Sequence, residues 1–360
     1  MSENVMVRLE GVTKIFTDCT AVDNQDLDIY EGEFLTLLGP SGCGKTTTLR
    51  MIAGLEIPTN GRILIHGEDV TFNLPSERDT SIMFQNYALF PHKTVGENIA
   101  FGLKMRGIDK KEQEIKVREM LDFVQLPAVY DRKPHQLSGG QCQRVALARS
   151  LVMQPSVLLL DEPLGALDAG LRKAMQLELK NIQRKTGITF IYVTHDQEEA
   201  LTMSDRIAVM QNGVIEQLAP PSVIYEQPKN EFVAKFVGRC NLIPGKVIEQ
   251  ENGLVLVSND ALGRLRAKNP AGEIRAGEEV KILVRPEKVW FSNQNNTANG
   301  TVISKAYVGS RVDYQIECNG LVLLVEADAL VDLYIGDEVD VCWEAKDSII
   351  MPKNFCNTTE

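Results

Sequence analysis

The chain has 360 residues, 44% of them hydrophobic and 24% charged, and its formal net charge is -11. This length predicts two domains, and the composition is typical of a soluble globular protein. The acidic balance argues against non-specific nucleic-acid binding, which needs a basic face, and the apolar stretches are much shorter than the roughly 18 residues of a membrane span.

The termini and cysteines carry no targeting or disulfide signal. Residues 1–4 lack a basic region followed by an apolar core, which predicts no signal peptide. The 7 cysteines are scattered without a Cys-x-x-Cys pair, so neither a disulfide framework nor a zinc site is expected and a reducing cytoplasm is the simpler interpretation. A partner would be needed to hold the protein at a membrane.

The first part of the chain alternates predicted strands and helices. Strands are expected between residues 5 and 38 and at 61–66, 80–84, 157–160 and 189–194. Helices are expected at 45–53, 95–124, 140–153, 171–185 and 197–203. This alternation predicts an α/β fold with a mainly parallel sheet, and the helical block between strands predicts an inserted helical subdomain at about 87–157.

The character of the chain changes after Gly213. Asn212-Gly213 between two apolar runs predicts a hairpin turn, and three prolines at 220, 221 and 228 then indicate a connecting stretch. From about residue 241 helical periodicity is largely absent, and residues 336–344 alternate polar and apolar side chains. Short alternating strands predict a small all-β, barrel-like domain. We therefore expect domains at 1–235 and 236–360.

Residues 39–46 match the phosphate-loop pattern G-x-x-x-x-G-K-[ST] between a predicted strand and a predicted helix. The glycines allow several backbone N–H groups to point at one phosphate, and the helix adds its positive end. Lys45 supplies a cation for the β- and γ-phosphates, and the Thr46 hydroxyl can ligate Mg²⁺. The loop therefore predicts a P-loop NTPase whose phosphate-binding residues are Gly39, Pro40, Ser41, Gly42, Cys43, Gly44, Lys45, Thr46 and Thr47.

Two carboxylates follow the apolar run 157–160, which is the Walker B arrangement. Adjacent strand residues point to opposite sides, so Asp161 and Glu162 should have different roles. Asp161 can hold Mg²⁺ through water, and Glu162 can orient and deprotonate the attacking water as a general base.

A second anion site is predicted at Leu137-Ser138-Gly139-Gly140-Gln141 before a long helix. Ser138 is a good N-cap, and the glycines expose backbone N–H groups at the helix start. Since the chain already has a complete phosphate loop, a second γ-phosphate site suggests that two chains share each nucleotide.

Over its first 235 or so residues the chain resembles the ATP-binding subunits of ABC transporters, and residues 137–141 resemble their signature motif. The resemblance implies a head-to-tail homodimer that hydrolyses ATP with Mg²⁺. The signature residues of one subunit, Ser138, Gly139, Gly140 and Gln141, would then cap the ATP held by Lys45 of the other.

Single residues match further elements of that family. Gln85 resembles the Q-loop glutamine, which senses Mg²⁺ and the attacking water, and His195 resembles the switch histidine that contacts the γ-phosphate. Asp168 fits the D-loop at the dimer interface, and Phe16 stands where an aromatic ring stacks on adenine. The chain departs from the usual pattern in having Gly165 in place of Ser and Phe16 in place of Tyr or Trp.

The second domain resembles the OB-type regulatory domain of importers for sugars, polyamines, iron and oxyanions, and Arg285-Pro286-Glu287 fits its recurrent pattern. The chain is most similar to the spermidine/putrescine import branch. This implies two integral-membrane permease subunits as partners, an indirect link to a substrate-binding protein, no nucleic acid, and a peripheral location at the cytoplasmic face of the membrane.

Several alternatives remain open at this point. The cargo could instead be ferric iron, a sugar or an oxyanion, because the transported molecule passes through the permease. The second domain could bind a regulatory ligand, hold two subunits together, or do both. A soluble ABC protein acting on nucleic acid usually brings zinc modules, coiled coils or two cassettes, and a P-loop kinase or GTPase would lack residues 138–141 and His195.

Overall fold

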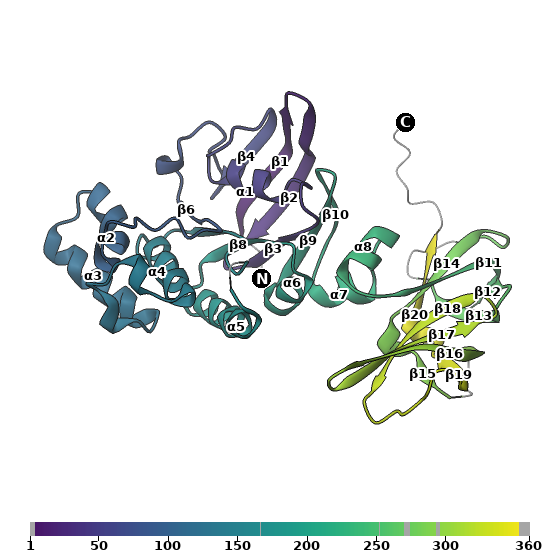
Figure 1. The fold of residues 1–360 in the computed structure, drawn as a ribbon. Coiled ribbons are helices and arrows are strands. Elements are labelled where there is room, and N and C mark those ends of the chain that lie inside the picture. The colour runs from purple at the N-terminus through teal and green to yellow at the C-terminus, as the bar shows by residue number, and fades with distance from the viewer. Residues whose placement is uncertain (1–3, 166, 252, 270–273, 293–295, 353–360) are drawn as a thin grey trace. The chain divides into compact units, whose positions relative to one another are not determined.

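The structure is a computed structural model that describes residues 4–165, 167–251, 253–269, 274–292 and 296–352 (Figure 1). Ala166 of the predicted D-loop therefore lies outside the described residues. The chain divides into two compact units, Met1–Ser222 and Val223–Glu360. This division precedes the expected boundary at residue 235, because the segment after Ser222 forms contacts with the strands that follow it.

The first unit is built on a mainly parallel sheet with the strand order β10-β9-β3-β8-β7-β6. β10 alone among these described strands pairs antiparallel, through the Asn212-Gly213 hairpin turn, where both residues have positive φ (48° and 84°). Every residue of β3, β7 and β8 is buried, as expected for strands covered on both faces. The bounds are β3 (Phe34–Leu38), β6 (Thr80–Met83), β7 (Val157–Asp161), β8 (Thr189–Thr194), β9 (Arg206–Gln211) and β10 (Val214–Ala219).

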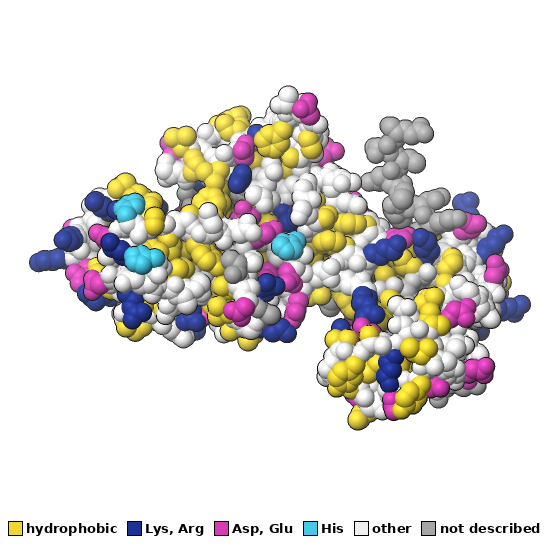
Figure 2. Space-filling view, in the orientation of Figure 1, with side chains coloured by type: hydrophobic (Ala, Val, Ile, Leu, Met, Phe, Trp, Pro, Cys, Tyr) yellow, Lys and Arg dark blue, Asp and Glu magenta, His cyan; other side chains and the backbone are white. Residues whose placement is uncertain are grey.

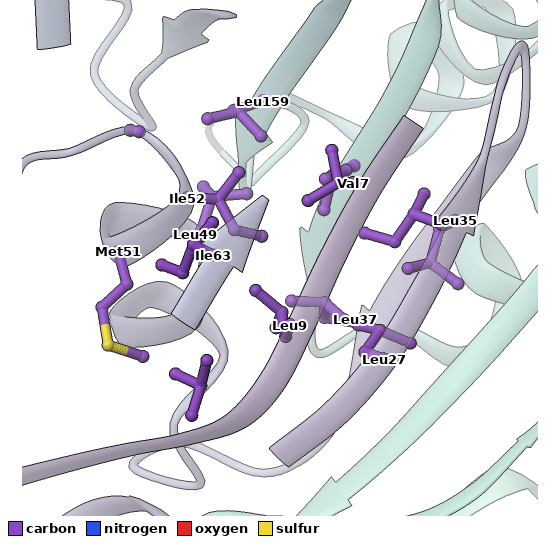
Figure 3. Close-up of a cluster of buried hydrophobic side chains, with 14 of the residues drawn as sticks. Val7, Leu9, Leu27, Leu35, Leu37, Leu49, Met51, Ile52, Ile63 and Leu159 are labelled. Carbon is purple, nitrogen blue, oxygen red and sulfur yellow. The ribbon is translucent and has the colours of Figure 1, made fainter. Parts of the chain in front are cut away.

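A separate antiparallel sheet, in the order β2-β1-β4-β5, covers part of the same core. Its strands are β1 (Val5–Phe16), β2 (Cys19–Tyr30), β4 (Asn60–Ile65) and β5 (Glu68–Asp69). Figure 3 shows the apolar side chains of β1, β2 and β4 meeting those of helix α1 (Lys45–Ile52) and of the parallel strands. The labelled members are Val7, Leu9, Leu27, Leu35, Leu37, Leu49, Met51, Ile52, Ile63 and Leu159.

The predicted helical block is divided into α2 (Val95–Met105) and α3 (Lys110–Phe123), and α4 (Gly139–Leu151) packs against both. Thr94 and Asp109 cap the first two helices by accepting hydrogen bonds from backbone N–H groups. The three helices share a buried apolar cluster of their own. Helices α5 (Ala169–Thr186) and α6 (Gln197–Met203) complete the unit.

Two short helices lie at the start of the second unit and just before it, where the prolines indicate a connecting stretch. They are α7 (Pro221–Glu226) and α8 (Glu231–Val237), whose lengths of 6 and 7 residues are too short to show a periodic apolar pattern. Ala234 of α8 packs on Leu283 and Met351, so this helix belongs with the strands. The connecting stretch that the prolines indicate therefore contains two helices, and the second of them packs with the strands.

The strands of the second unit form a closed barrel, β11-β12-β13-β20-β14, and a sheet, β15-β19-β16-β17-β18, around one buried cluster. The predicted alternation in β19 holds only in part, because Val341, Cys342 and Trp343 are all buried. The bounds are β11 (Asn241–Glu251), β12 (Leu254–Asn259), β13 (Gly263–Lys268), β14 (Glu279–Val284), β15 (Trp290–Phe291), β16 (Asn296–Val308), β17 (Arg311–Cys318), β18 (Leu321–Asp328), β19 (Glu338–Trp343) and β20 (Ser348–Pro352).

Candidate active site

The candidate catalytic residues lie at one edge of the parallel sheet. The phosphate loop follows β3, His195 follows β8, Asp161 and Glu162 end and follow β7, and Gln85 follows β6. These four strands are neighbours in the order β3-β8-β7-β6 and all run parallel. Their carboxyl ends therefore meet at the same edge, where ligands of open α/β sheets bind.

The phosphate loop is held by its own lysine and by a glycine that no other residue could replace easily. Lys45 is 5% exposed, and its Nζ donates hydrogen bonds to the carbonyl oxygens of Gly39 (2.7 Å) and Pro40 (2.8 Å). Gly44 has φ 104°, and a Cβ there would collide with the carbonyl oxygen of Ala21. Since Gly44 has no side chain to cap α1, the first N–H groups of this helix are available to an anion.

Asp161 and Thr46 form the part of the site suited to a cation. The Thr46 hydroxyl donates to Asp161 Oδ1 at 3.0 Å. Asp161 is buried at the end of β7, and this burial raises the pKa of its carboxyl group, while the hydrogen bond from Thr46 opposes the rise. A divalent cation at these oxygens would favour the ionised carboxylate.

Glu162 lies between the side chains of Gln85 and His195. Gln85 Nε2 donates to Glu162 Oε2 at 3.3 Å, and His195 Nδ1 lies 3.2 Å from Glu162 Oε1. The backbone of Glu162 is in the left-handed region (φ 45°), which is uncommon for a residue with a side chain and typical of functional sites. The backbone N–H of Glu162 donates to the carbonyl of Val193 in β8 at 3.0 Å, and this bond attaches the turn after β7 to that strand. Asp161 and Glu162 thus have different partners. Strand alternation does not account for this difference, because β7 ends at Asp161 and Glu162 has a left-handed backbone.

The signature segment lies elsewhere in the unit. Ser138 caps α4 by accepting from the N–H of Gln141 (3.4 Å), while Gln141 Oε1 accepts from the N–H of Ser138 (3.0 Å). Figure 1 shows α4 and the phosphate-loop helix α1 well apart. Over the described part of the chain, no hydrogen bond joins residues 138–141 to residues 39–47.

Two other expected site residues, Asp168 and Phe16, form their contacts away from the phosphate loop. Asp168 Oδ1 accepts from the N–H of Leu171 (2.9 Å) and so caps α5. Phe16 ends β1 with 43% of its surface exposed, and Lys14 Nζ lies 4.9 Å from its ring centroid. The roles of Asp168 and Phe16 stay predictions.

The sequence did not point to the residues that hold the segment after Gln85. Tyr87 and Ala88 both have positive φ (60° and 45°), and the Arg149 guanidinium donates to their carbonyl oxygens at 2.8 and 2.7 Å. The Asn98 side chain accepts from the N–H of Phe90 (2.8 Å) and donates to its carbonyl (3.2 Å). Asn98 could have been noticed, because it is a polar residue among the apolar positions of α2.

Comparison with known proteins decides the family. A model described as "ABC transporter" matches residues 22–165, and one described as "TOBE domain" matches residues 282–351. The spermidine/putrescine import ATP-binding protein PotA of Rubrobacter xylanophilus is 51% identical, over 96% of this chain and 94% of its own length. The chain belongs to the ABC transporter family.

Other members of the ABC family support the assignment. The PotA protein of Marinobacter nauticus is 46% identical over 95% of this chain and 94% of its own length. Among solved structures, the dimeric ATP-binding cassette MJ0796 bound to ADP and Pi is 33% identical, with a TM-score of 0.54 over 60% of this chain and 99% of that chain. The cbiO1 protein from Clostridium perfringens is 29% identical, with a TM-score of 0.58 over 65% and 93%.

The expected fold class is therefore confirmed: an ABC ATPase fold with a mainly parallel sheet, followed by an OB-type domain. Nucleotide binding follows from membership of the family. None of the described helices has both the length and the apolar character that a membrane span requires. On the face shown in Figure 2, basic and acidic side chains are interspersed over the first unit and do not gather by sign.

Proposed function

We propose that this chain is the ATP-hydrolysing subunit of an ABC importer for polyamines such as spermidine and putrescine. It acts as a homodimer beneath two permease subunits, at the cytoplasmic face of the membrane, and meets the substrate-binding protein only through the permease. The observation that carries the proposed catalysis is the position of Glu162 between Gln85 and His195, at the sheet edge that also holds Lys45. The names of the relatives, which are import ATP-binding proteins for spermidine and putrescine, support the choice of cargo.

The proposed reaction is in-line attack of water on the γ-phosphate of ATP. Residues 39–47 hold the phosphates through backbone N–H groups, and Lys45 exchanges its loop carbonyls for phosphate oxygens. Glu162 takes the proton of the attacking water, Gln85 orients that water, and His195 holds the γ-phosphate side of the site. Phe16 stacks on the adenine ring.

The residues present fit a magnesium ion. Thr46 and Asp161 offer hydroxyl and carboxylate oxygens, which Mg²⁺ prefers, and Gln85 lies at the same edge. Mg²⁺ is commonly bound by one or two carboxylates together with substrate phosphates, so a single carboxylate and a hydroxyl are a sufficient protein contribution. When bound, this ion would neutralise charge on the β- and γ-phosphates.

The separation of the signature segment from the phosphate loop supports the proposed dimer. Residues 138–141 expose the start of α4, which suits a phosphate, yet they lie apart from α1 of the same subunit. In a head-to-tail pair, Ser138 and Gly140 of one subunit cap the ATP of the other, and Asp168 lies at the contact between them. ATP binding then closes the dimer, and the segment after Gln85 transmits this closure through the helical subdomain to the permease.

A substitution at Glu162 tests the proposed catalysis. Glu162→Gln keeps the shape of the side chain but removes the general base, so ATP turnover should fall by about 10²–10⁴ while ATP still binds and a closed dimer accumulates. Turnover is measured as phosphate release and closure by size-exclusion chromatography with ATP. Turnover at the wild-type rate would remove Glu162 from the mechanism.

Reconstitution in vesicles with the chain's own permease and binding protein tests the cargo. We expect spermidine or putrescine to stimulate ATP hydrolysis, and ferric ion and maltose to have no effect. Stimulation by ferric ion or maltose alone would overturn the polyamine assignment and leave the ATPase mechanism standing. ATP turnover that is the same with and without the permease and the binding protein would count against a transport role.

A further inference from the structure

A buried glutamine outside the expected site joins two elements next to the phosphate loop. Gln25 on β2 is 2% exposed, and its amide is used at both ends. Nε2 donates to the Gly213 carbonyl at 3.0 Å, and Oε1 accepts from the Thr48 hydroxyl at 3.1 Å. Gly213 belongs to the β9–β10 turn and Thr48 to α1, so a single side chain bridges segments that are distant in sequence.

These bonds close into a ring that passes through the phosphate loop. The N–H of Gly213 donates to the Cys43 carbonyl at 3.2 Å. The Thr48 hydroxyl, with one proton to donate, lies 3.1 Å from both Gln25 Oε1 and the Gly44 carbonyl, which also accepts from the Thr48 N–H at 2.9 Å. The carbonyl groups of Cys43 and Gly44, two successive residues of the loop, are thus both fixed by hydrogen bonds.

Holding these carbonyls fixes the direction of the neighbouring N–H groups. A peptide unit is planar and trans, so its C=O and N–H point in opposite directions. The carbonyls of Cys43 and Gly44 therefore set the N–H groups of Gly44 and Lys45, which belong to the loop and helix start that bind phosphate. We infer that Gln25 is a positioning residue for ATP, which orients the phosphate-binding N–H groups through this ring.

The packing around the ring leaves little freedom for an alternative arrangement. The Gly213 backbone has φ 84°, and a Cβ there would lie 3.2 Å from the Ala21 carbonyl oxygen, the same atom that a Cβ on Gly44 would meet. The N–H of Asp23 also donates to the Gly213 carbonyl at 3.0 Å. The phosphate loop, the β9–β10 turn and β2 are in contact here, so the phosphate site is ordered before ATP binds. This preorganisation raises the affinity of the site for ATP.

The inference rests on the proposed ATPase function. It predicts that the loss of Gln25 affects the binding of ATP but not the rate of its hydrolysis. Within the described part of the chain, the Gln25 side chain forms its hydrogen bonds with Gly213 and Thr48 and none with Gln85, Glu162 or His195. Its loss should therefore raise the dissociation constant and KM for ATP and leave kcat at saturating ATP nearly unchanged.

The test compares Gln25→Leu with Gln183→Leu in the full-length chain. Gln183 is a matched control, because it is also buried and its Nε2 also donates to a glycine carbonyl, that of Gly32. For Gln25→Leu we expect the ATP dissociation constant, measured by calorimetry, to rise about tenfold and kcat to stay within about twofold, since a hydrogen-bond network is lost. Gln183→Leu should keep wild-type ATP affinity, whatever its melting temperature.

Thr48→Val breaks the ring from the other side and replaces the first variant if that one fails to fold. Its ATP dissociation constant should rise about threefold, because one hydroxyl bond is lost. Wild-type affinity in whichever ring variant folds, or equal weakening in Gln183→Leu, would overturn the inference alone. A wild-type chain that binds no ATP would overturn the proposed function as well.

Discussion

Each unit of the molecule buries a cation among backbone carbonyl groups. In the first unit, Lys45 donates to the carbonyls of Gly39 and Pro40 at 2.7 and 2.8 Å. In the second unit, Arg285, which is 3% exposed, donates to the carbonyls of Tyr225, Ala234 and Arg239 at 2.8 to 3.2 Å. The Arg285 guanidinium also lies 4.1 Å from the ring centroid of Tyr225.

The two cations differ in what their acceptors belong to. Both acceptors of Lys45 lie in its own loop, so a phosphate can replace them without disturbing another element. The acceptors of Arg285 lie on α7, on α8 and before β11, so its bonds tie the two helices to the barrel. Burial lowers the pKa of Arg285 below its ordinary value, and an arginine guanidinium nevertheless stays protonated in proteins. Both cations are buried, so burial does not distinguish the ligand-binding cation from the structural one. What differs is whether the acceptor carbonyl groups belong to one loop or to several elements of the fold.

The largest effect is expected from Lys45→Met, which tests whether Lys45 binds the ligand or stabilises the fold. ATP turnover should fall at least about 10²-fold, because a cation that stabilises charge on the phosphates is lost. The melting temperature should change little, since both hydrogen bonds stay within the loop. Phosphate release and thermal melting of the same preparation check both statements, and a large loss of stability would contradict the distinction.

Arg285→Met should destabilise the second unit by about 2–4 kcal/mol, because several carbonyls lose their donor together. Trp290 and Trp343, the protein's 2 tryptophans, both lie in this unit, so their fluorescence during urea denaturation reports its unfolding. Arg264→Met, at an exposed position of β13, is the control and should leave the midpoint unchanged. Equal midpoints for both variants would remove the structural role of Arg285.

Glu199 is a buried acidic side chain and can be compared with the two buried cations. It is 3% exposed and accepts from the hydroxyls of Tyr192 and Thr194 at 2.7 Å each, beside His195. Burial raises its pKa above the ordinary 4.5, so the fold favours the neutral carboxyl. This stabilising contribution is complete below the unfolded pKa and is lost as the pH rises through the folded pKa.

Glu199→Gln cannot ionise, so its stability relative to wild type should increase as the pH rises from 4.5 toward neutrality. The gain is about 1.4 kcal/mol for each unit by which the fold raises the pKa. Because the tryptophans lie in the other unit, unfolding is followed by circular dichroism of the helices at several pH values. Parallel stability curves for the two proteins would show that the fold does not raise the pKa of Glu199.

The smallest effect is expected from an exposed cation that has a carboxylate partner. Lys173 Nζ lies 3.2 Å from Glu198, but 68% and 64% of the two side chains are exposed. Lys173→Ala should change the free energy of unfolding by no more than about 0.5 kcal/mol, since exposed ion pairs contribute little. A loss comparable to that of Arg285→Met would mean that pairing matters more than burial in this protein.

The elements that could be predicted from the sequence depend on nearby residues. The phosphate loop, the Asn212-Gly213 turn and the Ser138 cap each follow from a short pattern whose backbone requirement is local. The strand carrying Asp161 followed from an apolar run, which reports burial on both faces. Each of these was expected within a residue or two of where the structure has it.

The features that could not be predicted depend on distant pairing. In the antiparallel sheet β1 pairs with β4, although the phosphate loop lies between them in the sequence. No local sequence pattern specifies that register. Gln25 and Gly213 are joined although 188 positions separate them, and Arg149 holds carbonyls more than 60 positions away. The sequence neighbours of Gln25 are themselves polar, so nothing in the local sequence marks it as buried.

Helix α4 joins the Ser138 end of the unit to the segment after Gln85. It begins with the Ser138 cap and carries Arg149, bonded to Tyr87 and Ala88, in its last turn. At 1.5 Å per residue these ends are about 16 Å apart, so a tilt of about 4° at one end moves the other by about 1 Å. Such a displacement is comparable to the tolerance of the two Arg149 bonds. In the proposed dimer this helix would act as a rigid lever, because a change of its tilt at the Ser138 end would move the segment after Gln85 in the same subunit.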